Sequence, residues 1–188
     1  MSGLFWPRGG LLKGHFPGSI IVEGCRKILR FSRAQQKTSS EFRWCKWCLT
    51  DYVKYFSNGL LNSSLDPIDT INDWATRTID RLLQAGFKQG DIIIDPGIGF
   101  GKSAYQSRHL IHCAERIKQH GCQVLVGHSR KSFMTSFCTL EPYHRDLETV
   151  AVSSFLHTQG IDFLRVHDVQ QHQRFFVANH AMCGGVRV

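Results

Sequence analysis

Residues 91–103, "DIIIDPGIGFGKS", decide the fold class of this 188-residue chain. Three isoleucines run directly into Asp95, and Pro96 and glycines at every second position follow. A short continuous apolar run that ends in turn-forming residues is typical of a strand buried on both faces. We therefore predict a central strand that delivers Asp95 to a tight loop.

Helix and strand patterns alternate on both sides of this strand. Apolar strands are expected at 122–129 and 161–168, and helices over 66–87, 103–121, 145–160 and 169–182. Regular alternation of this kind predicts an α/β fold, in which crossover helices connect the strands of a parallel sheet. The helical pattern over 145–160 runs through Leu147, Val150, Ala151, Ser154, Phe155 and Leu156.

Polar side chains follow each of the three predicted strands. The first strand ends at Asp95, the second is followed by Ser129–Lys131, and the third carries Arg165, His167 and Asp168 at its end. In parallel α/β folds the chemistry lies at the carboxyl ends of the strands. We therefore expect these residues to converge on one site.

The segment "GFGKS" suggests a nucleotide-binding loop, but neither common motif fits. A P-loop needs a glycine where this chain has Pro96, and proline removes a backbone donor that a phosphate would use. The dinucleotide-binding pattern requires a small residue where Lys102 stands. Asp95 leaves two interpretations open. It could accept paired N–H bonds from a heterocycle with a guanidine-like edge, or it could cap the following helix.

Composition and length limit the kind of protein. The chain is 42% apolar and 20% charged, which is ordinary for a globular domain, and it contains no apolar run long enough for a membrane helix. No apolar leader is evident, so we expect a cytoplasmic location. A complete (β/α)8 barrel typically needs about 250 residues, more than are present.

The basic charge is concentrated in residues 1–50, which hold nine Lys/Arg and two Asp/Glu. We interpret these residues as a poorly ordered leader, separate from a domain over 51–188. The alternative is a nucleic-acid-binding arm in which Phe42, Trp44 and Trp47 stack on bases. The cysteines, which include a lone C-x-x-C at Cys45 and Cys48, are predicted to be reduced thiols without a metal.

Four segments resemble dihydropteroate synthase in order and spacing. They are "DPGIGFGK" (95–102), "LVGHSRKSF" (125–133), "HRDLETVAV" (144–152) and "RVHDV" (165–169). The resemblance covers roughly residues 65–188 and implies the C-terminal part of a (β/α)8 TIM barrel. It also implies the family's reaction in folate biosynthesis, in which 6-hydroxymethyl-7,8-dihydropterin pyrophosphate and 4-aminobenzoate give dihydropteroate and pyrophosphate. Sulfonamides compete for the aminobenzoate site in that family, and a homodimer is expected of its full-length members.

The same resemblance implies roles at the strand ends. Asp95 would hold the pterin ring, Phe100 would wall the pocket, and Lys131 would contact the carbonyl edge of the pterin. Ser129 and Arg130 would line the aminobenzoate entrance.

Arg165 and His167 would bind the leaving pyrophosphate, because Arg makes bidentate contacts to phosphate oxygens and His adds a donor. The alternatives are an ion pair of Arg165 with Asp162 or Asp168 and a purely structural His167. The remaining histidines are predicted to be surface or helix-face residues without function, namely His109, His112, His120, His128, His144, His157, His172 and His180.

The sequence departs from the family in its first part. The "MN-x-T-x-D-S-F" motif, whose asparagine helps to hold Mg²⁺, is not found. The resemblance therefore implies Mg²⁺ as a cofactor, but the motif that carries its ligand is absent from this sequence. Three or four strands cannot close a barrel, and the missing strands would leave sheet edges open. We therefore expect a truncated remnant that is weak or inactive alone. The runner-up hypothesis is a catalytically dead fragment with a basic nucleic-acid-binding arm.

Overall fold

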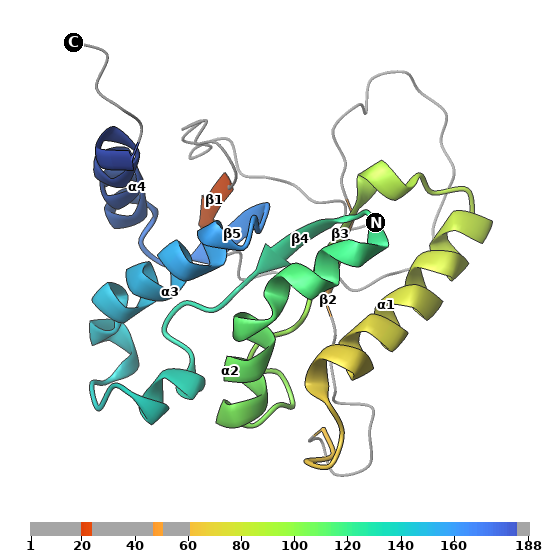
Figure 1. Ribbon diagram of the computed structural model, residues 1–188, viewed down its shortest axis with the longest axis horizontal. Coiled ribbons are helices and arrows are strands. Elements are labelled where there is room, and N and C mark those ends of the chain that lie inside the picture. Colours follow the sequence, from red (N-terminus) through yellow and green to blue (C-terminus); the bar gives the residue numbers. More distant parts are fainter. Residues whose placement is uncertain (1–19, 24–46, 51–60, 184–188) are drawn as a thin grey trace.

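The computed structural model describes residues 20–23, 47–50 and 61–183 (Figure 1). Within these ranges helices and strands alternate from residue 67 onward, as the sequence predicts. The strands are β1 (Ile20–Glu23), β2 (Trp47–Thr50), β3 (Ile92–Asp95), β4 (Gln123–Val126) and β5 (Phe163–Val166). The α-helices are α1 (Pro67–Gln84), α2 (Ala104–His112), α3 (Asp146–Thr158) and α4 (Val169–Cys183). Short 3-10 helices cover Gln89–Asp91, Ala114–His120, Ser132–Ser136 and Pro142–His144.

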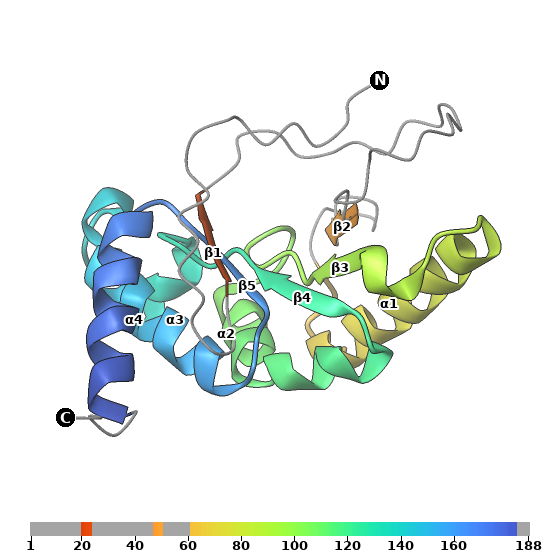
Figure 2. The same cartoon turned by 90° about the horizontal axis from the view of Figure 1, so that it is seen from above.

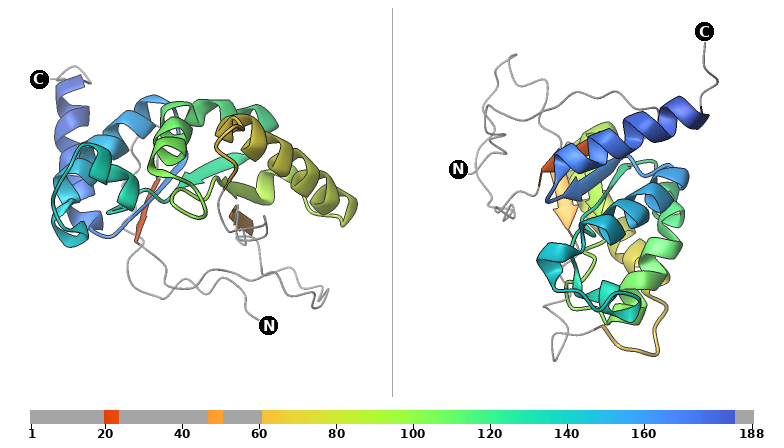
Figure 3. Two further views of the ribbon diagram at one scale, coloured as in Figure 1. Left: turned by 90° about the horizontal axis from the view of Figure 1, so that it is seen from below. Right: turned by 90° about the vertical axis from the view of Figure 1, so that its left-hand side faces the viewer.

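The five strands form one parallel sheet in the order β1-β5-β4-β3-β2. The four α-helices lie together on one face of this sheet (Figures 2 and 3). A single helical layer outside parallel strands is the arrangement of part of a (β/α)8 barrel, so the predicted fold class is confirmed.

Two strands come from residues 1–50, which the sequence analysis assigned to a leader. Strand β1 pairs with β5, and Ile20 lies opposite Phe163 in the register. Strand β2 pairs with β3, and Thr50 lies opposite Asp95. Each outer strand of the β3–β4–β5 unit is thus paired at its free edge. The other residues of the leader, and with them the proposed aromatic arm, lie largely outside the described residues. The division of the chain at residue 50 therefore stays a prediction.

The main core lies between the sheet and the helices. Successive side chains of a strand point to opposite faces, so Ile92, Ile94 and Val124 pack against the helices and are fully buried. Ile93 and Leu125 point to the other face and form a separate small cluster with Phe163. No helix in the described part of the chain is both long and apolar enough to cross a bilayer.

Local capping explains where the first two α-helices begin. The Asp66 carboxylate accepts from the backbone N–H of Ile68 at 2.7 Å, and Pro67 starts α1. Ser103 and Gln106 form a reciprocal capping box that starts α2. The single helix predicted over 103–121 is wrong, because α2 ends at His112 and a 3-10 helix continues the segment.

The buried face of α3 differs from the one that its apolar residues suggested. Leu147 is 77% exposed and Phe155 is 41% exposed, whereas the polar Thr149 and Ser153 are completely buried. The predicted pattern through Leu147, Ala151 and Phe155 is therefore wrong. Thr149 and Ser153 are four residues apart and lie on one helical face, where they meet polar partners from other elements.

Candidate functional site

The site lies where β3, β4 and β5 end side by side. Asp95 is the last residue of β3, Ser129–Lys131 follow β4, and Arg165 and His167 lie at the end of β5. Because these strands are parallel neighbours, their carboxyl ends meet at one edge of the sheet. The predicted residues do converge on this edge.

Asp95 is 1% exposed and is held by partners from two elements. Its Oδ1 accepts from the backbone N–H of Gly97 at 2.9 Å, and its Oδ2 lies 3.3 Å from Nη2 of Arg165. The carboxylate thus braces the loop directly after it and does not cap α2, which Ser103 caps. Of the two interpretations of Asp95, helix capping is excluded.

Arg165 pairs with Asp95, not with either of the nearer aspartates in sequence. Asp162 accepts from the backbone N–H of Val124 at 2.9 Å and from Lys118 at 3.2 Å. Asp168 accepts from the backbone N–H of Gln171 and so caps the start of α4. The two alternative ion pairs considered for Arg165 are therefore wrong.

Lys131 lies over the glycine-rich loop. Its Nζ donates to the carbonyl oxygen of Ile98 and lies 3.7 Å from the centroid of the Phe100 ring, a cation–π contact. Burial lowers the pKa of Lys131 to about 8, while the charge of Asp95 opposes this shift and that of Arg165 adds to it. The protonated amine still predominates at neutral pH.

The glycine-rich loop itself is braced by Lys102. This side chain is 7% exposed, and its Nζ donates to the carbonyl oxygens of Gly97 and Phe100, each at 3.2 Å. A P-loop lysine reaches toward a phosphate instead. The contacts of Lys102 therefore agree with the rejection of a nucleotide-binding loop.

Ser129 and His167 contact each other across the ends of β4 and β5. The Ser129 hydroxyl lies 2.8 Å from Nδ1 of His167 and also accepts from the His167 backbone N–H at 3.3 Å. Burial lowers the pKa of His167, and the nearby charges of Arg130, Arg165 and Lys131 lower it further. His167 is therefore a neutral imidazole at pH 7.

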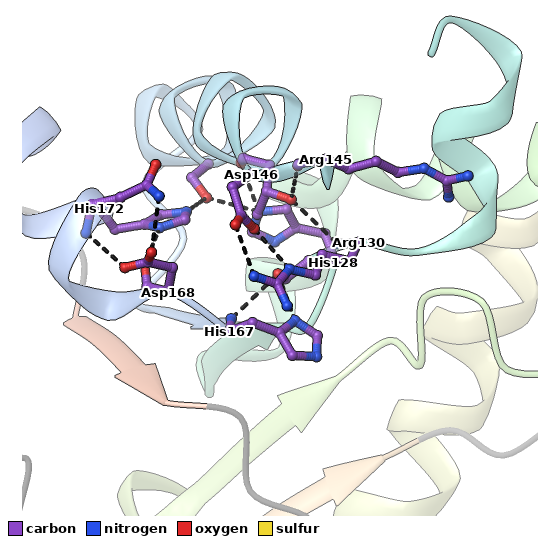
Figure 4. A network of polar contacts seen from close by, with 11 residues as sticks. His128, Arg130, Arg145, Asp146, His167, Asp168 and His172 are labelled. Atoms are coloured by element: carbon purple, nitrogen blue, oxygen red, sulfur yellow. Dashed lines mark hydrogen bonds and ion pairs between the residues drawn. The ribbon is translucent and has the colours of Figure 1, made fainter. Parts of the chain in front are cut away.

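Arg130 makes a bidentate ion pair with Asp146 at the start of α3 (Figure 4). Its Nε and Nη2 each donate to one carboxylate oxygen at 2.7 Å. The residue has a φ of 57°, which is uncommon outside glycine, and its backbone N–H donates to Thr149. Asp146 is therefore a partner of the site that sequence reasoning missed. Arg145 is another, because it donates to the carbonyl oxygens of Leu140 and Lys131.

A buried polar network lies behind these residues and connects the segment after β4 with α3 and α4 (Figure 4). The Ser153 hydroxyl lies 2.7 Å from Nε2 of His128 and 2.9 Å from Nε2 of His172. His128 is 0% exposed and lies outside any helix, so the prediction of a surface or helix-face residue is wrong for it. His172 does lie on helix α4, but at 1% exposure it is buried and not on the surface. The signal that could have revealed them is the four-residue spacing of Thr149 and Ser153, which places two polar residues on one helical face.

Hydrogen-bond chemistry fixes the protons in this network. Nδ1 of His172 faces the carbonyl oxygen of Asp168 at 2.7 Å, so Nδ1 carries the proton and Nε2 accepts from Ser153. The Ser153 oxygen then accepts from Nε2–H of His128, which also faces the carbonyl oxygen of Thr149 at 3.3 Å. Both imidazoles are neutral in this arrangement. Burial lowers the pKa of His128 to about 4 and also lowers that of His172.

Metal-ligating side chains do not form a cluster among the described residues. No group of three or more His, Cys, Asp or Glu side chains among them is arranged to hold a metal ion. Two carboxylates near the strand ends already have cationic partners, since Asp95 contacts Arg165 and Asp146 contacts Arg130. Cys113, Cys122 and Cys138 are free thiols, as predicted for them.

The fold is part of a (β/α)8 barrel, since it has parallel strands and an outer layer of helices. Its charged residues lie at the carboxyl ends of the strands, where active sites of such barrels are found. The family of pterin binding enzymes matches residues 51–167, so the chain belongs to that family. A folate synthesis bifunctional protein from Chlamydia caviae is 40% identical over 120 residues, which are 64% of this chain and 26% of that protein. A dihydropteroate synthase from Clostridium beijerinckii is 39% identical over 107 residues, 56% of this chain and 39% of that protein.

Solved structures agree with this assignment. The dihydropteroate synthase from Anaplasma phagocytophilum with bound 6-hydroxymethylpterin-monophosphate has 30% sequence identity and a TM-score of 0.64, over 72% of this chain and 54% of that one. The enzyme from Xanthomonas albilineans with 4-aminobenzoic acid has 25% identity and a TM-score of 0.66, over 74% of this chain and 50% of that one. The chain thus spans about half the length of these structures and about a quarter of the Chlamydia relative.

Proposed function

We propose that this chain carries the pterin- and pyrophosphate-binding part of a dihydropteroate synthase site. The complete reaction would join 6-hydroxymethyl-7,8-dihydropterin pyrophosphate to 4-aminobenzoate and release pyrophosphate. The observation that supports this proposal best is the contact of one buried carboxylate, Asp95, with the guanidinium of Arg165, beside the ammonium of Lys131. A heterocycle with a donor edge and a diphosphate would need these charges close together.

Asp95 would accept the paired N–H donors of the pterin ring. Its Oδ1 already accepts from the backbone N–H of Gly97, which fixes the orientation of the carboxylate at the end of β3. Lys131 would contact the carbonyl edge of the same ring, because its Nζ now donates to a backbone carbonyl oxygen at the site. Phe100, which lies under that ammonium, would form an apolar wall for the pocket.

Arg165 and His167 would stabilise the leaving pyrophosphate. As the bond between the pterin methylene carbon and the phosphate oxygen breaks, the pyrophosphate takes the electron pair and negative charge develops on its oxygens. The amine nitrogen of 4-aminobenzoate forms the new bond to carbon and then loses a proton. A neutral His167 would assist if Ser129 donates to Nδ1, since Nε2–H then points a donor toward the anion.

Ser129 and Arg130 would line the entrance for 4-aminobenzoate. The pair with Asp146 fixes the Arg130 guanidinium, so it would act as part of a wall and not as a mobile clamp. We extend the proposal to competition by sulfonamides at this entrance, to a homodimer and to a cytoplasmic location. We assign no magnesium ligand among the described residues, because Asp95 and Asp146 at the strand ends already contact arginines.

The test measures binding of 6-hydroxymethylpterin by saturation-transfer NMR, which detects weak complexes. Asp95→Asn removes the carboxylate charge at nearly constant shape, and charge-assisted hydrogen bonds are worth about 1.5–3 kcal/mol. We expect the affinity to fall roughly tenfold or more. Asp91→Asn is the matched control, because Asp91 is exposed just before the same strand. Equal affinities of the two variants would refute the proposal.

A further inference from the structure

Arg165 occupies the oxygen of Asp95 that a ligand would need. Its Nη2 lies 3.3 Å from Oδ2, while the backbone N–H of Gly97 holds Oδ1. The Asp95 side chain is 1% exposed and that of Arg165 is 24% exposed, so Arg165 is the more solvent-accessible partner of this pair.

The guanidinium of arginine and the amino-pyrimidinone edge of a pterin have the same recognition chemistry. Each is planar and offers parallel N–H donors to a carboxylate. One buried oxygen cannot serve both at full strength, so the two groups compete for Asp95. A protein side chain that imitates the ligand at its own site lowers the apparent affinity for that ligand until the side chain moves.

Arg165 reaches Asp95 across the intervening strand, and a glycine makes this possible. Strand β4 lies between β3 and β5 (Figure 1), and Gly127 directly follows its last residue, Val126. A Cβ at Gly127 would lie 2.4 Å from Nη2, 2.8 Å from Nε and 2.9 Å from Cζ of Arg165. Any side chain at this position would therefore displace the guanidinium from its present place.

The surrounding charges allow Arg165 to leave. Lys131 interacts electrostatically with both Asp95 and Arg165, so Asp95 keeps a cationic neighbour when the guanidinium moves. A buried carboxylate stripped of every partner would be far more costly. A diphosphate offers Arg165 a stronger bidentate partner than a carboxylate it contacts with one nitrogen.

Building on the proposed function, we infer that Arg165 covers Asp95 in the ligand-free protein and that a diphosphate draws it away. Gly127 is the positioning residue that permits this cover. The diphosphate and the heterocycle then bind cooperatively, although they occupy separate parts of the site. Coupling between two ligands commonly changes affinity by about 5- to 150-fold, and a single 3.3 Å contact places the expected effect at about five- to tenfold.

The experiment titrates 6-hydroxymethylpterin into the full chain by saturation-transfer NMR, with and without saturating inorganic pyrophosphate. We expect pyrophosphate to raise the pterin affinity about five- to tenfold, and pterin to raise the pyrophosphate affinity by the same factor. Arg165→Met should bind the pterin in the absence of pyrophosphate about as tightly as the native chain binds it in the presence of pyrophosphate. Arg174→Met, at an exposed position on α4, is the matched control and should behave as the native chain.

Gly127→Ala distinguishes the effect of moving the Arg165 guanidinium away from Asp95 from the effect of removing its positive charge. It keeps Arg165 but moves the guanidinium, so we expect higher pterin affinity without pyrophosphate and a coupling factor near one. Circular dichroism verifies that each variant is folded, and the native chain and Arg165→Met decide the matter if Gly127→Ala does not fold. If the pterin affinity of the native chain is the same with and without pyrophosphate, and is no higher in Arg165→Met, the inference is overturned while the proposed function stands. Pterin that binds neither protein overturns the proposed function, and the inference with it.

Discussion

Replacing Ser153 by alanine removes the hydroxyl that two buried imidazoles share. Nε2 of His172 loses its donor, and Nε2 of His128 keeps only the longer contact to the Thr149 carbonyl at 3.3 Å. A buried polar group left without a partner costs about 1–3 kcal/mol. Nε2 of His172 would have no hydrogen-bond partner left, and Nε2 of His128 would keep one weaker partner. We therefore expect Ser153→Ala to lose about 2–4 kcal/mol of unfolding free energy at pH 7.

Urea unfolding followed by circular dichroism measures this loss. Ser154→Ala is the matched control, because it makes the same change one position along α3, away from the network. Alanine favours a helix slightly more than serine does, so the control should change the free energy by less than about 0.5 kcal/mol. If the two variants are equally stable, Ser153 does not bridge the imidazoles, and the proton arrangement deduced for the network is wrong.

Three further outcomes follow from charges near the site. The pKa of His128 is lowered to about 4, so as pH falls below about 6.5 the unfolded chain takes up the proton before the native chain does. Between pH 7 and pH 5 the native sequence should therefore lose about 2 kcal/mol more unfolding free energy than His128→Gln, as measured by urea unfolding. After reductive methylation with ¹³C-formaldehyde, one resonance should titrate near pH 8 and be missing in Lys131→Arg. Asp146→Asn should cost about 2 kcal/mol at pH 7 by breaking the pair with Arg130. Since Arg130 lowers the pKa of Asp146, that difference should shrink as acid protonates the native carboxylate.

The order of elements was predictable because it depends on local patterns. The isoleucines before Asp95 mark a buried strand whatever the rest of the chain does, and the alternation around it requires parallel neighbours. Convergence of the strand ends then follows from geometry alone. The break after His112 was not predictable, because no glycine or proline interrupts the apolar pattern there.

The partners of the site residues depend on contacts between distant segments. Arg165 has acidic residues three positions away on either side, Asp162 and Asp168, yet it pairs with Asp95 two strands away. That pairing requires the absence of a side chain at Gly127, which no local pattern reveals. For the same reason the polar face of α3 was misassigned, since Ser153 is buried only because its imidazole partners come from other elements.

The neutral network and the charged strand ends depend on each other. Lys131, Arg165 and Arg130 place positive charges at one edge of the sheet, where the charge of Lys131 further lowers the pKa of His128. A protonated His128 would add a fully buried charge beside the cation of Lys131, which is the costly case. Hydrogen bonds between neutral groups fasten the loops after β4 and β5 without that cost. A site built to attract a diphosphate is therefore best supported from behind by polar groups that stay uncharged, as His128 and Ser153 do here.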